Sequence, residues 1–243
     1  MHMSSAHRRE KIILAVGYGW FAGIPEGQTN NAELIVRALD GEILHAGGTH
    51  AKICSIVVPV VWDAAFPPVE EAIRRLSPDI VLAVGTAAGA SALRPEPVAV
   101  NWAEGSDASG GEGQSRACRI DERGEDVLYA SLPFEEATRA LLERGIPAQL
   151  GCLREAPQGA LVPHRCTAGA YLCNYMNYRL AQYAKACGHP LRTGFLHVPT
   201  QPAYACAQRL SGSVPLTQPM PACMPLETMI EGTRALLTAC LQD

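Results

Sequence analysis

The sequence predicts an α/β fold: a single-domain, three-layer αβα sandwich with a mainly parallel, twisted central sheet. Short apolar runs that end at or just before a glycine, such as residues 11–17 and 80–84, are typical of strands buried on both faces. Segments with helical spacing of apolar residues alternate with these runs along the chain. Such alternation places helices on both faces of a parallel sheet.

The first half of the chain begins with the strand at residues 11–17. A helix follows at residues 31–39, with Asn30 or Asn31 as its N-cap and Gly41 as its stop. Next come a strand rich in β-branched residues, a short helix that starts with proline, and two more strands. These elements cover residues 51–61, 68–76, 80–84 and 97–102.

The second half contains two irregular stretches between its helices. Residues 103–117 are polar and rich in Gly and Ser, which predicts a mobile surface loop, and residues 152–166 form a second irregular stretch. A proline-punctuated loop precedes the last helix. The remaining elements are helices at residues 133–144 and 168–186, a strand at 193–198 and a final helix at 226–241. In such a sheet, active sites collect at the carboxyl ends of the strands.

Composition limits the function further. The 243 residues are 48% hydrophobic, enough for one core, so we expect one α/β domain over residues 11–243 after a disordered tail at 1–10. A net charge of -4 argues against nucleic-acid binding. No apolar run approaches the roughly 20 residues that cross a bilayer, and no signal peptide is evident, so we expect a cytoplasmic protein without membrane contact. The low charged fraction, 18%, is compatible with a homo-oligomer.

The nine cysteines are scattered and odd in number, which argues against a disulfide framework. Cys152, His164 and Cys166 come nearest to a metal cluster, but their spacing matches no common zinc pattern. We therefore expect no metal, and most of the thiols should be small buried hydrophobic groups.

One cysteine has a setting that suits a nucleophile. The run T-A-G-A-Y-L-C-N-Y at residues 167–175 enters the long helix, with Thr167 as its expected cap and Cys173 within its first two turns. The positive end of a helix favours a thiolate. Taken alone, the segment favours a buried cysteine packed between Leu172 and Tyr175, because buried cysteines outnumber reactive ones.

A histidine at the end of one strand and a glutamate before another are expected at the same edge of the predicted sheet. His197, in G-F-L-H-V-P, closes an apolar strand and could act as a general base or could simply be hydrogen-bonded there. Glu96 follows the small-residue loop after Val84 and could orient the imidazole, or it could be a solvated turn residue.

The segment V-G-Y-G-W-F-A-G at residues 16–23 contains G-x-G-x-x-A, a weak dinucleotide fingerprint. No helix starts at once after it, so we expect no dinucleotide cofactor. An aromatic wall of Tyr18, Trp20 and Phe21 suits a flat, uncharged ring better.

Together these segments resemble the pyroglutamyl peptidase I family, the pyrrolidone-carboxylate peptidases. G-Y-G-W-F-A-G followed by Asn30 is similar to the family's G-F-E-P-F-G-G…N opening. P-D-I-V-L-A-V-G, then G-A-S and P-E-P-V-A-V-N, resembles the stretch that carries the family glutamate, here Glu96. E-R-G-I-P-A at 143–148 also has a counterpart. The most specific matches are A-G-A-Y-L-C-N-Y, with the nucleophile Cys173, and G-F-L-H-V-P, with the base His197.

The resemblance implies a cysteine peptidase without a cofactor that releases an N-terminal 5-oxoproline from a small peptide. His197 would take the thiol proton, Cys173 would attack the acyl carbon, and Glu96 would orient the imidazole. Tyr18, Phe21 and Thr86 would line the lactam pocket by the same resemblance.

The sequence departs from the family on the substrate side. Gly19 and Trp20 replace the usual Glu-Pro pair, and Ala90 stands where many members have arginine. The acidic D-N-E-G loop is reduced to S-G-G-E-G at 109–113, and extra residues precede the nucleophile helix. The expected catalytic residues therefore match the family, whereas several residues on the expected substrate side differ from it.

Three alternatives stay open. One is a related amidase that acts on a different lactam or cyclic amide. Another is a non-catalytic or nucleoside-phosphorylase-like binding protein that uses the loop at 85–91 for an anion, although only Arg94 lies near that loop in the sequence. The third makes Cys166 and His164 the reactive pair, on a stretch with no rigid support.

Overall fold

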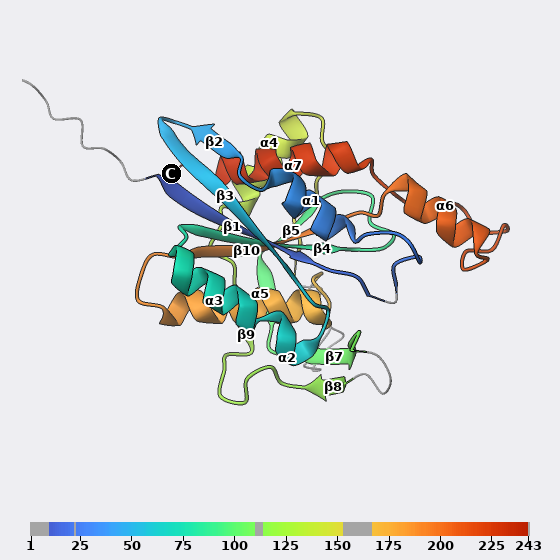
Figure 1. The fold of residues 1–243 in the computed structure, drawn as a ribbon, viewed down its shortest axis with the longest axis horizontal. Coiled ribbons are helices and arrows are strands. Elements are labelled where there is room, and N and C mark those ends of the chain that lie inside the picture. Colours follow the sequence, from blue (N-terminus) through green and yellow to red (C-terminus); the bar gives the residue numbers. More distant parts are fainter. Residues whose placement is uncertain (1–9, 22, 110–113, 153–166, 243) are drawn as a thin grey trace, which may run out of the picture.

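A computed structural model describes residues 10–21, 23–109, 114–152 and 167–242. Its centre is a six-stranded sheet with the order β2-β3-β1-β4-β10-β5 (Figure 1). The four inner strands run parallel: β3 (Thr49–Val58), β1 (Lys11–Tyr18), β4 (Ile80–Thr86) and β10 (Arg192–Val198). The edge strands are antiparallel to their neighbours: β2 (Ile43–Ala46) and β5 (Arg94–Glu96). The predicted mainly parallel sheet is confirmed.

Helices cover both faces of this sheet (Figure 1). On one face lie α1 (Asn31–Leu39), α4 (Phe134–Glu143) and α7 (Leu226–Cys240). On the other lie α2 (Trp62–Ala65), α3 (Pro67–Leu76) and α5 (Leu172–Ala186). In β1, Ile13 and Ala15 join the first core, whereas Leu14 and Val16 join the second. Alternate residues thus enter two cores, which is why the strand is apolar throughout.

The start of α1 agrees with the sequence expectation. The side chain of Asn30 accepts a hydrogen bond from the Ala32 N–H at 3.0 Å, so Asn30 is the N-cap. The helix lies close to β1 at Gly17, where a Cβ atom would come within 2.7 Å of the Ala32 carbonyl oxygen. Glycine therefore lets α1 approach the strand and fixes where Asn30 stands.

The strand predicted at 97–102 is shorter in the structure and lies outside the main sheet. Pro97 separates β5 from β6 (Val98–Val100), and β6 pairs with β9 (Val127–Tyr129) outside the main sheet. Proline has no N–H to donate to a ladder, so it is a natural point for the chain to change sheets.

The prediction of a mobile loop at 103–117 is wrong where the structure describes it. β7 (Ala103–Ser106) and β8 (Ser115–Cys118) form a hairpin, and residues 110–113 lie outside the described part. The Trp62 indole N–H donates to the carbonyls of Gly105 and Gln114, which holds the hairpin against α2. Composition alone could not reveal this tertiary contact.

A helix, α6 (Pro202–Leu210), occupies part of the expected proline-punctuated loop; it starts with proline, as helices often do. Residues 1–9 of the tail expected at 1–10, and residues 153–166 of the irregular stretch expected at 152–166, fall outside the described residues. None of the described helices has both the length and the apolarity needed to span a bilayer.

Candidate active site

Three parallel strands deliver side chains to one edge of the sheet. Tyr18 ends β1, Thr86 ends β4, and His197 is the second-last residue of β10. The register sets His197 beside Gly85, so the ends of β4 and β10 are level. The carboxyl ends of parallel strands meet at the same edge, which is where such folds place their active sites.

The helix α5 brings Cys173 to this edge. Its N-cap is Tyr171, so Cys173 is the second helical residue. The prediction that Thr167 caps this helix is wrong, because Gly169 between them has a φ of +77°. A right-handed helix cannot continue through that conformation. The shorter helix places Cys173 nearer to its N-terminus, where unpaired N–H groups and the helix dipole favour negative charge.

Cys173 is also fixed against the sheet. A Cβ atom on Gly85 would come within 2.9 Å of Cys173 Sγ and 2.7 Å of the Phe195 ring. The thiol therefore lies directly over the end of β4, and glycine provides the space for it.

Glu96 and His197 meet across the antiparallel pair of β5 and β10. Glu96 lies opposite Phe195, and Arg94 lies opposite His197, so all four side chains project from the same face of the sheet. Phe195 belongs to the core under α5, which identifies that face as the one that carries Cys173. His197 Nδ1 is 2.8 Å from Glu96 Oε1, and the two residues are 5% and 1% exposed.

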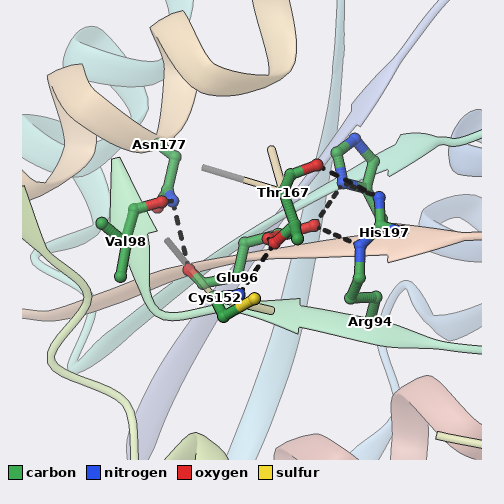
Figure 2. A network of polar contacts seen from close by, with 7 residues as sticks. All are labelled: Arg94, Glu96, Val98, Cys152, Thr167, Asn177 and His197. Atoms are coloured by element: carbon green, nitrogen blue, oxygen red, sulfur yellow. Dashed lines mark hydrogen bonds and ion pairs between the residues drawn. The ribbon is translucent and has the colours of Figure 1, made fainter. Parts of the chain in front are cut away.

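The Glu96 carboxylate accepts hydrogen bonds at both oxygens (Figure 2). Oε1 accepts from His197 Nδ1 and, at 2.6 Å, from Arg94 Nε. Oε2 accepts from the Thr167 hydroxyl. A Cβ atom on Gly151 would lie 2.2 Å from Oε2, so this carboxylate fits only because residue 151 is glycine.

These contacts set the charges of the pair. Burial by itself lowers the pKa of His197, but the negative charge and hydrogen bond of Cys173, together with Glu96, overcome it and raise that pKa to about 9. Burial also opposes ionisation of Glu96, yet hydrogen bonds from His197, Thr167 and Arg94 hold its pKa below its ordinary value. The site thus favours an ionised carboxylate at Glu96 and a protonated imidazole at His197.

A cavity of about 260 Å³ opens beside Cys173. Its walls are aromatic, aliphatic or neutral polar side chains: Tyr18, Phe21, Asn30, Val60, Thr86, Ala88, Tyr171, Leu172 and Cys173. No carboxylate, ammonium, guanidinium or imidazole group is among these lining side chains. A pocket of this kind suits a small, flat, neutral group.

Hydrogen bonds among the lining residues hold the cavity in shape. The Tyr18 hydroxyl donates to the Leu172 carbonyl at 2.5 Å, which ties β1 to the start of α5. The Thr86 hydroxyl donates to Asn30 Oδ1 at 2.7 Å, and Asn30 Nδ2 donates to the Gly19 carbonyl at 2.8 Å. The Thr86 oxygen keeps lone pairs with which it can accept a further hydrogen bond.

All the residues expected at the site lie at this edge. Cys173, His197 and Glu96 form one hydrogen-bonded group, and Tyr18, Phe21 and Thr86 line the cavity beside it. The alternative pair of His164 and Cys166 lies outside the described residues.

Sequence reasoning missed the role of two residues here. Arg94 was considered only as a cation near an anion-binding loop, and Thr167 only as a helix cap, but both bind Glu96. The spacing Arg94-x-Glu96 was a usable signal, because residues two apart on a strand share a face. No local signal marked Thr167, which reaches Glu96 across 71 positions of sequence.

Fold and site together define a cysteine hydrolase: a thiol at a helix start, an imidazole and a carboxylate gathered at the edge of an α/β sheet. Comparison with known proteins narrows this class. The family model for pyroglutamyl peptidase matches residues 11–243, so the chain belongs to the pyroglutamyl peptidase family. Its members are cysteine peptidases that remove N-terminal pyroglutamyl residues.

Individual relatives agree with the family model. A pyrrolidone-carboxylate peptidase of Vibrio campbellii is 30% identical over 233 residues, covering 96% of this chain and 94% of the relative. One from Saccharolobus islandicus is 28% identical and covers 86% of each chain. The resemblance seen in the sequence is confirmed.

Solved structures with a similar fold belong to the same kind of peptidase. A mutant pyrrolidone carboxyl peptidase from Pyrococcus furiosus superposes with a TM-score of 0.77 at 27% identity, covering 96% of this chain and 99% of that one. The pyrrolidone carboxyl peptidase from Thermococcus litoralis gives a TM-score of 0.77 at 25% identity, covering 95% and 93%.

Proposed function

We propose that this chain hydrolyses the amide bond between an N-terminal 5-oxoprolyl residue and the residue that follows it in a small peptide. Cys173 is the nucleophile, His197 the general base and acid, and Glu96 the residue that orients the imidazole. The observation that carries the proposal is the hydrogen-bonded connection from Glu96 through His197 to Cys173 beside a neutral cavity.

The first step forms the acyl-enzyme. His197 accepts the proton of the Cys173 thiol, and the sulfur attacks the acyl carbon of the 5-oxoprolyl group. Backbone N–H groups at the start of α5 stabilise the oxyanion of the tetrahedral intermediate. As that intermediate collapses, the C–N bond breaks and the imidazolium gives its proton to the leaving amine.

The second step regenerates the thiol. His197, neutral again, accepts a proton from water as its oxygen attacks the thioester carbon, and the C–S bond breaks to release 5-oxoproline. Glu96 stays ionised throughout, because it stabilises the imidazolium without taking its proton.

The cavity supports a lactam substrate. A 5-oxoprolyl ring has no charge, so walls such as Tyr18, Phe21 and Val60 can enclose it without leaving a buried ion unpaired. Its lactam N–H needs an acceptor, and the Thr86 oxygen is one within the lining.

The direct test is hydrolysis of a 5-oxoprolyl arylamide by the purified protein and by Cys173→Ala and His197→Ala. We expect turnover by the wild type, a loss on the order of 10⁴-fold or more for Cys173→Ala, and about 10²–10⁴-fold for His197→Ala. A panel of other cyclic amides tests the amidase alternative. Failure of the folded wild type to cleave the 5-oxoprolyl substrate, or full activity of Cys173→Ala, would refute the proposal.

Alkylation gives a second test that needs no substrate. Iodoacetamide at neutral pH should modify Cys173 faster than the exposed thiols of Cys118, Cys206 and Cys223, because His197 is hydrogen-bonded to Cys173 and can take its proton. Mass spectrometry of the digested protein measures each site. In His197→Ala the preference should disappear, and equal labelling of all these thiols in the wild type would contradict an activated pair.

A further inference from the structure

Arg94 occupies an unusual position for a cation. It lies directly opposite His197 in the β5–β10 register, and its side chain is 22% exposed. Its Nε donates to Glu96 Oε1 at 2.6 Å, and its Nη2 donates to the Thr167 carbonyl at 3.2 Å (Figure 2). The same Nη2 is 3.5 Å from His197 Nδ1. A permanent positive charge therefore lies next to the imidazole that has to become positive during the reaction.

The guanidinium and the imidazole use the same oxygen. Glu96 Oε1 accepts from both Arg94 Nε and His197 Nδ1, whereas Oε2 is occupied by the Thr167 hydroxyl. When Nδ1 carries the proton that it donates to Glu96, it cannot accept from Arg94, so the 3.5 Å contact brings two N–H donors together. This contact opposes the imidazolium, and the shared oxygen divides the attraction of the carboxylate between two cations.

We propose that Arg94 is a positioning residue that fixes the Glu96 carboxylate and, by sharing Oε1 with His197, loosens the imidazolium so that it can deliver its proton to the leaving amine. The proposal rests on the function proposed above. In the step concerned, the proton taken from Cys173 Sγ passes to the amine nitrogen as the C–N bond breaks. The bonding electrons leave with the nitrogen, so no further reactant is needed.

The need for such a residue follows from the other charges around His197. Cys173 faces the ring from α5 and Glu96 faces it from β5, and both stabilise the protonated form. On β4, Gly85 and Thr86 lie beside the end of β10 and carry no charge. When the amine leaves, the Cys173 sulfur is bonded to the acyl carbon, and Glu96 remains as the anion that holds the ring. An imidazolium held by this carboxylate is a weaker acid, and a weaker acid protonates a leaving amine more slowly. Arg94 is the cation that offsets this hold.

Arginine suits the task better than lysine. Its planar fork binds the Glu96 oxygen through one nitrogen and the Thr167 carbonyl through another, so the guanidinium is fixed at two points. An ammonium group could supply the charge but not this pair of contacts in the same plane.

The test compares two leaving groups. A 5-oxoprolyl alkylamide releases an amine that must be protonated, whereas a 5-oxoprolyl aryl ester releases a phenolate that needs no proton. For Arg94→Met, we expect kcat/KM to fall about 10–100-fold on the amide and less than about threefold on the ester. Arg94→Lys should fall between the wild type and Arg94→Met on the amide.

The pH dependence of Cys173 alkylation supplies a readout that requires no turnover. Without Arg94, the imidazolium–thiolate pair should persist to higher pH, moving the upper limb of the profile by about 0.5–1 pH unit. Arg119→Met is the matched control, because Arg119 also binds one carboxylate, that of Asp126, and two backbone carbonyls. It should leave both measurements unchanged.

Two results would overturn the inference. One is an equal loss on amide and ester with an unmoved pH limb, which is what a purely structural role produces. The other is no loss on either substrate. If Arg94→Met does not fold, Arg94→Gln and Arg94→Lys supply the same comparison. Absence of activity in the wild type would instead refute the proposed function, and the alkylation profiles would still report whether Arg94 acts on the pair.

Discussion

The part of the site around Glu96 and His197 is organised by charge, whereas the cavity beside Cys173 is organised by neutral surface. Glu96 is 1% exposed and receives hydrogen bonds from Arg94, Thr167 and His197. The cavity is lined by aromatic, aliphatic and neutral polar groups. We call these the charged half and the neutral half.

This difference determines how well each half of the site tolerates amino-acid substitution. A buried ion pair is costly to break, because the remaining charge has no partner, so the charged half tolerates little change. A neutral pocket changes its preference with shape at a cost of only about 1–3 kcal/mol per methylene-sized alteration. The departures from the family pattern at Gly19, Trp20 and Ala90 leave Glu96 and His197 in place, and none of these three residues is among the residues that line the cavity.

The strongest test of the comparison is Glu96→Gln. We expect kcat to fall about 10²–10⁴-fold, because an amide neither stabilises the imidazolium nor accepts from three donors. KM should stay within a few-fold, since the cavity is separate. Steady-state kinetics with a 5-oxoprolyl amide separates the two constants, and Glu26→Gln, in an exposed loop, is the control. A rise in KM with unchanged kcat would show that the two halves are not distinct.

The second test uses pH and stability. The pKa of His197 is raised from an ordinary 6.5 to about 9, so its contribution to stability is complete below about pH 6.5 and is lost as pH rises through 9. At about 1.4 kcal/mol per pH unit, the free energy of unfolding should fall by up to about 3 kcal/mol over this range. Urea unfolding at pH 7, 8 and 9.5 measures it.

Cys173→Ala is the control for this titration. The thiolate charge is the largest of the interactions that raise the pKa of His197, so the variant should lose its stability at lower pH and by a smaller amount. Identical curves for wild type and variant would mean that the imidazole and the thiol do not interact in the folded protein.

The third test is Gly85→Ala, at the boundary between the halves. The added methyl would lie 2.7 Å from the Phe195 ring and 2.9 Å from Cys173 Sγ, so one of them has to move. We expect a stability loss of about 1–3 kcal/mol and a loss of kcat/KM on the order of 10²-fold. Gly19→Ala is the matched control, because its methyl meets nothing closer than 3.6 Å. Full activity of Gly85→Ala would show that the thiol position is not critical.

The two halves were also unequally predictable from the sequence. The ends of β1, β4 and β10 followed from apolar runs and glycines, so Tyr18, Thr86 and His197 could be assigned to one edge. The family resemblance favoured the pairing of Glu96 with His197 over a solvated turn glutamate. No local pattern decides between them, because the two residues are 101 positions apart.

What could not be predicted depends on contacts between distant segments. α5 starts at Leu172 and not at the predicted Ala168, because Gly169 adopts a positive φ and the Thr167 hydroxyl binds Glu96. The β7–β8 hairpin forms although its sequence is rich in Gly and Ser, because Trp62 binds its carbonyls. Propensity gives only a weak preference in such segments, and tertiary contacts override it.

The smallest expected effect belongs to Tyr18→Phe in the neutral half. The change keeps the ring and removes only the hydrogen bond from the Tyr18 hydroxyl to the Leu172 carbonyl. A net loss of about 0.5–1.5 kcal/mol lowers the melting temperature by about 2–6 °C. Because the cavity wall is unchanged, kcat and KM should stay within about threefold of the wild type.

Tyr129→Phe, on a tyrosine that is 66% exposed, should leave the melting temperature unchanged and serves as the control. Calorimetry and steady-state kinetics on both variants complete the comparison. A loss of kcat beyond about tenfold in Tyr18→Phe would mean that the bond to Leu172 holds the start of α5, and with it Cys173, in its reactive position. The neutral half would then share in positioning the nucleophile, and the division between the halves would have to be redrawn at α5.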